Sequence, residues 1–117
     1  MTFVEGFLAA VPTANRDAFI AHSRVMSGIC RENGALRVVD CWGADVPDGK
    51  VTSFPMAVKL AEGETVAFSW IEWPDKDTRD AGWAKMMEDP RMTPEANPMP
   101  FDGLRIVMGG FDVVVDL

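Results

Sequence analysis

Residues Thr65 to Trp73 constrain the fold of this chain more than any other segment. The run is β-branched and aromatic, follows a turn-like Glu-Gly-Glu sequence, and is stopped by Pro74. These features are typical of a strand rather than a helix. Alternation places large apolar side chains on both faces of the strand: Val66, Phe68 and Trp70 on one, and Ala67, Ile71 and Trp73 on the other. We therefore expect this strand at the centre of a sheet that is covered on both faces.

Three further strands are predicted, two before this run and one after it. They span Phe3 to Val11, Ala35 to Gly43 and Leu104 to Val115. Gly6 inside the first strand indicates a bulge or a close approach by another element. Gly109-Gly110 interrupts the last strand and predicts a bulge that lets it bend across a partner.

Two helices are predicted between the strands. The first is capped by Thr13 or Asn15 and stopped by Asn33-Gly34, and the second runs from Pro74-Asp75 to Pro90. The inward face of the first helix has helical spacing and comprises Phe19, His22, Ser23, Met26, Ile29 and Cys30. The inward stripe of the second comprises Arg79, Trp83, Met86 and Met87. Residues 53–60 fit either a short helix capped by Ser53 or an extra strand.

The resulting order is β-α-β-(insert)-β-α-β, the split βαβ pattern of a ferredoxin-like sheet with both helices on one face. We predict an α+β fold with an antiparallel sheet, and residues 1–117 as a single domain. The face of the sheet away from the helices would carry Trp or Phe side chains. An exposed aromatic patch of that size indicates a partner surface, which we expect to be a second copy of the chain.

Composition excludes several classes of partner. The net charge is −7, and no long basic run occurs, so binding to a nucleic-acid backbone is not expected. The sequence contains no signal peptide and no apolar segment that would span a membrane. With one His and only Cys30 and Cys41, it has no zinc motif, and the two cysteines are expected to be reduced thiols. We predict a cytoplasmic protein without a metal or cofactor.

Several motifs together resemble one family along nearly the whole chain. They are Asp45-Val46-Pro47-Asp48-Gly49-Lys50-Val51-Thr52, Phe68-Ser69-Trp70-Ile71-Glu72, Arg79-Asp80-Ala81, Asp89-Pro90-Arg91-Met92, Met99-Pro100-Phe101-Asp102-Gly103 and Gly109-Gly110-Phe111. This pattern is similar to that of the YbaA-like bacterial proteins, domain-of-unknown-function family 1428. The resemblance implies a dimeric α/β-barrel fold, an architecture shared with cofactor-free monooxygenases, muconolactone-isomerase-like proteins and haem-handling proteins. It implies no reaction.

Two positions depart from this resemblance. The family usually has Tyr immediately before Gly-Gly-Phe, where this chain has Met108, and the chain contains no Tyr. The family also tends to place Asn on the second helix where this chain has Trp83. If both positions line a pocket, the pocket of this protein is more apolar than those of its relatives.

His22 and Arg79 are the candidate catalytic residues. His22 is the only histidine and lies on the inward face of the first helix, where it would act as a general base or substrate anchor. The structural alternative is a core histidine bonded to the backbone. A buried Arg79 needs a carboxylate or a ligand anion, and Asp102 or Asp45 would serve as its partner. A structural ion pair that fixes the long loop is the alternative for Arg79.

The candidate ligand-binding residues combine apolar and charged groups. They are Trp70, Trp83, Met108, Asp102 and Arg105. In this hypothesis a small apolar or aromatic metabolite binds between helices and sheet, and the protein is either a binding protein or a cofactor-independent enzyme. The alternative is a non-catalytic homodimeric interaction or stress-related module. Haem binding through His22 is a third hypothesis. The identity of the ligand is not determined by the sequence.

Overall fold

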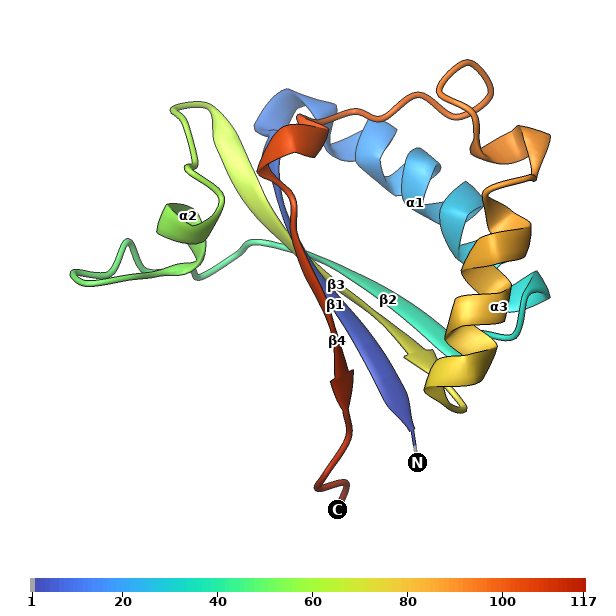
Figure 1. The fold of residues 1–117 in the computed structure, drawn as a ribbon. Coiled ribbons are helices and arrows are strands. Elements are labelled where there is room, and N and C mark those ends of the chain that lie inside the picture. The colour runs from blue at the N-terminus through green and yellow to red at the C-terminus, as the bar shows by residue number, and fades with distance from the viewer. Residues whose placement is uncertain (1) are drawn as a thin grey trace.

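A computed structural model describes residues 2–117 of the chain. Four strands form one antiparallel sheet in the order β2-β3-β1-β4 (Figure 1). The strands are β1 (Phe3–Pro12), β2 (Arg37–Trp42), β3 (Glu64–Trp73) and β4 (Val107–Asp112). The predicted central strand, β3, is hydrogen-bonded to both β1 and β2.

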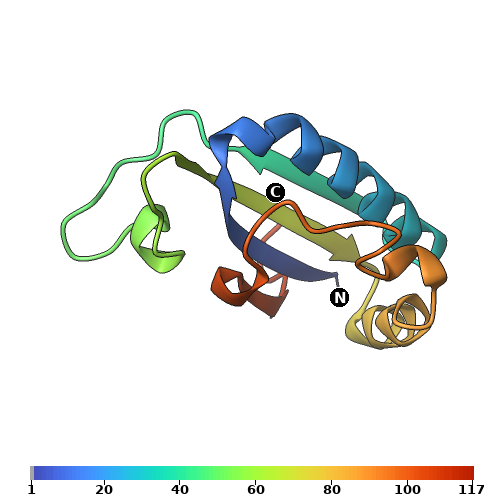
Figure 2. The ribbon, with the colours of Figure 1, turned by 90° about the horizontal axis from the view of Figure 1, so that it is seen from above.

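Two helices pack on the same face of this sheet (Figures 1 and 2). They are α1 (Arg16–Glu32) and α3 (Lys76–Met86). The remaining helix, α2 (Phe54–Ala57), lies in the insert between β2 and β3, and single 3-10 turns occur at Thr13–Asn15, Pro90–Met92 and Gly103–Arg105. The element order and the antiparallel sheet are those of the predicted ferredoxin-like α+β fold. Within residues 2–117, no helix has the length and apolar character needed to cross a membrane.

The main core lies between the helices and one face of the sheet. Odd-numbered residues of β1 and β3 point to this face, and Phe3, Ile71 and Trp73 pack there against Ile29 of α1 and Met86 of α3. On the opposite face, a smaller cluster joins Ala10 and Val66 to Val58, which follows α2. The rest of that face is open, so the expectation that both faces of β3 are covered is met only in part within one chain.

Capping side chains explain where the shorter helices begin. The hydroxyl of Ser53 accepts a hydrogen bond from the Met56 backbone N–H at 3.0 Å, which settles residues 53–60 as a helical turn rather than a strand. Asp75 accepts from the Thr78 N–H at 2.7 Å and begins α3. The predicted side-chain cap of α1 is wrong: Asn15 precedes the helix, but its amide donates to the Pro100 carbonyl at 3.0 Å instead.

Two further predictions about element boundaries are corrected. Met87 was assigned to the inward stripe of α3, but it follows the last residue of the helix and is 75% exposed. The last strand begins at Val107 rather than Leu104, because the Gly103–Arg105 turn, capped by Asp102, precedes it.

Gly109-Gly110 forms no bulge. The ladder between β1 and β4 is one-to-one, with Glu5 opposite Gly110 and Gly6 opposite Gly109. Gly110 instead permits a close approach: a Cβ at this position would lie 2.5 Å from the Phe3 ring. Neither predicted role of Gly6 is observed: its pairing with Trp70 and Gly109 is regular, and a Cβ there would lie at an ordinary contact distance, 3.9 Å, from the Phe111 ring.

Candidate functional site

A cavity of about 350 Å³ lies between α1, the helix-covered face of the sheet and the proline-rich loop 93–102. The sheet contributes Phe7, Ala9 and Met108, and α3 contributes Trp83. The loop contributes Asn97 and Phe101 among others, so it forms a further wall of the cavity. Most of the lining is apolar, and the few polar groups are therefore the ones that would orient a ligand.

His22 borders this cavity from the predicted inward face of α1. Its Nδ1 atom is buried and has no hydrogen-bond partner in the structure. The ring packs edge-on against Phe101 with 5.9 Å between ring centroids, and the His22 carbonyl accepts a long hydrogen bond, 3.4 Å, from the Asn97 amide. The helix therefore holds both the histidine and the loop that covers it. An unpaired buried polar atom is unusual, and a bound ligand would satisfy it.

Trp83 and Met108, the two positions that depart from the family pattern, both line the cavity. Both present apolar surface to it.

A buried carboxylate fixes the orientation of Trp83. Oε1 of Glu5 accepts hydrogen bonds from the indole nitrogens of Trp73, at 2.8 Å, and Trp83, at 2.7 Å. Glu5 is only 5% exposed, so its charge requires these donors. Sequence reasoning missed Glu5, although it alternates with Phe3 and Phe7 on the inward face of β1.

Arg79 lies beside Glu5 and does not line the cavity. Its guanidinium donates to Glu5 Oε2 at 3.2 Å and to Asp80 at 2.8 Å, and it stacks over the Phe3 ring at 4.7 Å. The predicted partners, Asp102 and Asp45, are therefore wrong, because Glu5 is nearer. Arg79 is thus in an ion pair, as the structural alternative expected, but the pair joins α3 to β1 rather than fixing the long loop. The geometry does not support a catalytic role for it.

Arg105 and Asp102 form a second ion-pair group outside the cavity. Arg105 donates to both carboxylate oxygens of Glu64, at 2.8 and 2.7 Å, and to Asp102 at 3.0 Å. These bonds, with the Ala61 N–H, lower the pKa of Glu64 to about 2. The pKa of Asp102 is also lowered, first by the Leu104 N–H and then by Arg105. The group ties the start of β4 to the start of β3, and neither predicted residue reaches the ligand cavity.

Trp70 lies on the opposite face of the sheet from Trp83 and Met108. Its indole nitrogen donates to Glu72 at 2.9 Å, and its ring packs against Phe68 with centroids 5.6 Å apart. The prediction that Trp70 encloses the same ligand as Trp83 is therefore incorrect, because even-numbered side chains of β3 point away from the helices.

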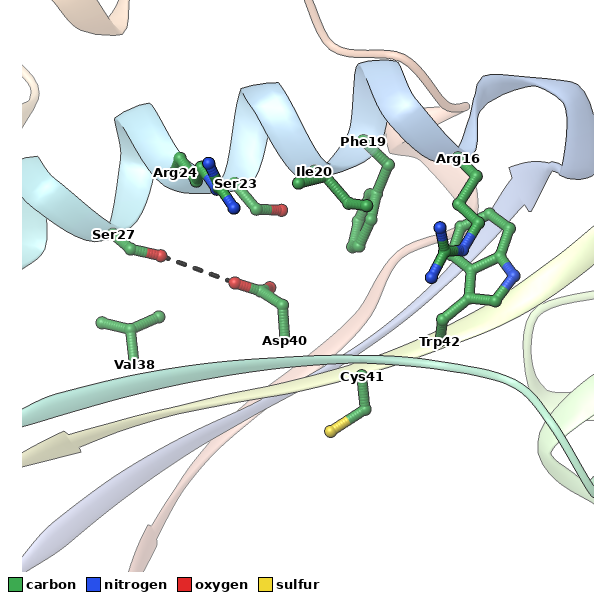
Figure 3. Close-up of a pocket in the computed structure, with 10 residues that line it drawn as sticks. All are labelled: Arg16, Phe19, Ile20, Ser23, Arg24, Ser27, Val38, Asp40, Cys41 and Trp42. Atoms are coloured by element: carbon green, nitrogen blue, oxygen red, sulfur yellow. Dashed lines mark hydrogen bonds between the residues drawn. The ribbon is translucent and has the colours of Figure 1, made fainter.

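A second cavity of about 520 Å³ opens between α1 and the edge strand β2 (Figure 3). It shares five lining residues with the first: Phe19, Ser23, Ser27, Val38 and Asp40. The two cavities therefore adjoin along α1 and β2.

Asp40 projects from β2 toward α1 where the cavities adjoin (Figure 3). Its Oδ1 accepts a short hydrogen bond, 2.6 Å, from Ser69, and its Oδ2 has a long contact, 3.5 Å, with Ser27. Sequence reasoning did not single out Asp40, although alternation places it on the inward face with Val38 and Trp42.

The thiol of Cys30 also borders the first cavity. Burial is the main cause that raises its pKa to about 12, with the Glu5 carboxylate adding to the effect. A thiol held in its neutral form is a poor nucleophile. Among residues 2–117, no three His, Cys, Asp or Glu side chains converge on a position that would hold a metal ion.

Comparison with solved structures supports the fold. A crystal structure described as a dimeric ferredoxin-like protein from an uncultured marine organism superposes with a TM-score of 0.66, covering 99% of this chain and 98% of the other. The two sequences are only 10% identical, so this likeness concerns the fold and not the function.

Sequence comparison gives much closer relatives. The uncharacterized protein YbaA of Escherichia coli K12 is 52% identical over 116 residues, which cover 99% of each chain, and YbaA of Shigella flexneri matches equally. The family model described as "Protein of unknown function (DUF1428)" matches residues 2–103. The chain therefore belongs to the DUF1428 family of proteins of unknown function.

Proposed function

We propose that this protein binds a small apolar or aromatic molecule in the cavity between its helices and its sheet. The observation that carries the proposal is the cavity of about 350 Å³ with the buried, unpaired Nδ1 of His22 on its wall. The volume falls within the range of about 300–1,000 Å³ typical of small-molecule sites.

Binding is better supported than catalysis. His22 supplies one nitrogen that would accept a proton or a hydrogen bond from a ligand. A general base is usually oriented by a third group, and the hydrogen bonds of the described residues give the His22 ring no such partner. The second candidate, Arg79, is already engaged by Glu5 and Asp80. A cofactor-independent reaction on the bound molecule would depend on His22 alone.

The binding test uses the neutral fluorescent probe N-phenyl-1-naphthylamine. We expect saturable fluorescence enhancement with the native protein and a loss of enhancement in Ala9→Leu, whose added side chain occupies the cavity. Ala57→Leu, an exposed position on α2, is the matched control and should bind as the native protein does. Equal enhancement in all three proteins would place the probe elsewhere and overturn the proposal.

Two copies of the chain are proposed to pair through the open face of the sheet. This face carries large apolar groups left exposed in one chain, among them Phe68 at 42% and Phe111 at 61%. Aromatic residues gathered on one face mark an interaction surface. The structural neighbour is described as dimeric, which supports a homodimer here. A stable pair would bury roughly 1,600 Å² in total.

The oligomeric state is measured by sedimentation equilibrium. We expect a dimer for the native protein and a folded monomer for Phe111→Asp. Leu104→Asp, at a fully exposed apolar residue outside this face, should remain dimeric. A native monomer would contradict the pairing. A dimer that does not bind the probe would favour the alternative function, a non-catalytic homodimeric interaction module.

The proposed location of the protein is the cytoplasm. The two free thiols, Cys30 and Cys41, favour this location.

A further inference from the structure

We propose that Asp40 is the polar anchor of the cavity and that it selects a ligand bearing a hydrogen-bond donor, an amine or a hydroxyl, on an apolar body. This inference rests on the proposed binding function and narrows the class of ligand. Asp40 is the one charged side chain among the described residues that line the inner cavity of about 350 Å³. A carboxylate accepts hydrogen bonds and donates none.

The hydrogen bonds of Asp40 leave one of its oxygens available. Ser69 donates to Oδ1 at 2.6 Å and orients the carboxylate, which is exposed to solvent on the edge strand β2. The 3.5 Å contact from Ser27 to Oδ2 is too long to satisfy that oxygen. Oδ2 faces α1 across the junction of the two cavities (Figure 3), so a donor on a ligand would reach it without displacing a protein group.

The second polar feature of the inner cavity is His22 Nδ1, which is buried and unpartnered. An amine or a hydroxyl on the ligand would donate a hydrogen bond to Asp40 Oδ2. The apolar body of the ligand would contact Phe7, Trp83 and Met108. A ligand carboxylate or phosphate would instead face the Asp40 carboxylate, with like charges opposed in a mostly apolar cavity.

Arg16 and Arg24 line the outer cavity and not the inner one. Arg16 lies over the Trp42 ring at 6.0 Å (Figure 3). Asp40 is exposed to solvent and lines both cavities, so the arginines stand on its outer side and the apolar lining on its inner side. An anion bound through the arginines would share the outer cavity with the Asp40 carboxylate, which would repel it.

The test compares three ligands that share one aromatic body: 1-naphthylmethylamine, 1-naphthylmethanol and 1-naphthylacetate. Isothermal titration of the native protein should give tighter binding of the amine and the alcohol than of the carboxylate, by about tenfold or more, as one charge-assisted hydrogen bond implies. Asp40→Asn should weaken the amine by a similar factor and improve the carboxylate. Asp45→Asn, which removes an exposed charge outside the cavities, is the control and should change neither.

Two outcomes overturn the inference, and they can be told apart from failure of the proposed function. If N-phenyl-1-naphthylamine binds but the carboxylate binds as tightly as the amine, Asp40 does not select the ligand. Asp40 also does not select the ligand if the Asp40→Asn variant binds the amine with unchanged affinity and binds N-phenyl-1-naphthylamine as the native protein does. If neither the neutral probe nor any naphthyl ligand binds, the cavity is not a binding site and both proposals fail.

Discussion

The carboxylate of Glu5 on β1 and the guanidinium of Arg79 on α3 lie 3.2 Å apart, joining strand and helix in the buried layer beside the candidate cavity. The indoles of Trp73 and Trp83 donate to the other oxygen of the same carboxylate. One acidic side chain thus holds three donors from β3 and α3. Since Trp83 is also a wall of the cavity, the cluster sets the shape of the site without entering it.

Glu5→Leu should be strongly destabilising. It removes the only acceptor that the structure gives both indole nitrogens and leaves Arg79 with Asp80 alone. Breaking a buried pair from one side typically costs about 3–5 kcal/mol. Chemical denaturation followed by Trp fluorescence would measure the free energy of unfolding. Glu32→Leu, which removes an exposed partner of Arg91, is the comparison and should change stability far less.

Neighbouring alanines of β1 should respond oppositely to enlargement. Ala9 lines the cavity, whereas Ala10 is fully buried against Val58 and Val66 on the other face. Ala9→Leu should therefore retain or raise the melting temperature by filling space. Ala10→Leu should overpack its cluster at a cost of about 1–3 kcal/mol. Similar losses of melting temperature in both variants would mean that no cavity lies beside Ala9.

The fold was accessible from the sequence because its signals are local. The β-branched, aromatic run of β3 and the apolar spacing of α1 each specify one element, and their order specifies the sheet. Boundaries set by capping were less accessible. Asn15 and Ser53 are equally plausible caps from the sequence, yet only Ser53 caps its helix, since the side chain of Asn15 bonds instead to Pro100, 85 residues away.

The site was predicted less completely because its partners are distant in sequence. Strand alternation places Trp70 on the face of β3 opposite Ile71 and Trp73, and so away from the helix that carries Trp83. It could not identify Glu5 as the hydrogen-bond acceptor of Trp83, 78 residues away. Arg79 was recognised as needing a carboxylate, and its partner was sought in turn-rich segments rather than within a strand. The inward position of His22 was predictable from helical spacing alone, a signal that needs no tertiary information.

The Glu64–Arg105 pair should make stability depend on pH in a narrow acidic window. Hydrogen bonds from Arg105 lower the folded-state pKa of Glu64 from 4.5 to about 2. A depressed carboxyl pKa contributes stability that is fully present above the unfolded pKa and is lost as the pH falls through the folded one. We expect Glu64→Gln to melt several degrees below the native protein near neutral pH, and the gap to close between about pH 4.5 and 2.

Melting temperatures of the two proteins across this range would test the linkage. Glu62→Gln, at an exposed acid of the same turn, controls for the loss of one negative charge. A difference between native protein and Glu64→Gln that persists unchanged to the acid end of the window would show that the pair contributes through packing rather than through its charge.

The two glycines of β4 should differ in their tolerance of alanine. A Cβ on Gly110 would lie 2.5 Å from the Phe3 ring, and Phe3 is 5% exposed and covered by Arg79. Because the ring has no free space to move into, Gly110→Ala should cost about 1–3 kcal/mol through overpacking. A Cβ on Gly109 would meet only the Phe111 ring, at 3.3 Å, and in a single chain that ring is 61% exposed and able to shift, so the two variants are compared at concentrations where the chain is monomeric.

The free energies of unfolding of Gly109→Ala and Gly110→Ala would therefore distinguish two reasons for the glycines: close packing against Phe3, or backbone freedom needed for a bulge. If the glycines were present to allow a bulge, Gly109→Ala and Gly110→Ala would be similarly destabilised, since each would restrict the same irregular backbone. The regular pairing of Gly6 with Gly109 and of Glu5 with Gly110 predicts the unequal result. Because Arg79 stacks over the Phe3 ring at 4.7 Å, a shift of that ring in Gly110→Ala should also move Arg79 and, through Glu5, Trp83. Weaker binding of N-phenyl-1-naphthylamine to Gly110→Ala than to Gly109→Ala would then connect this buried layer to the cavity.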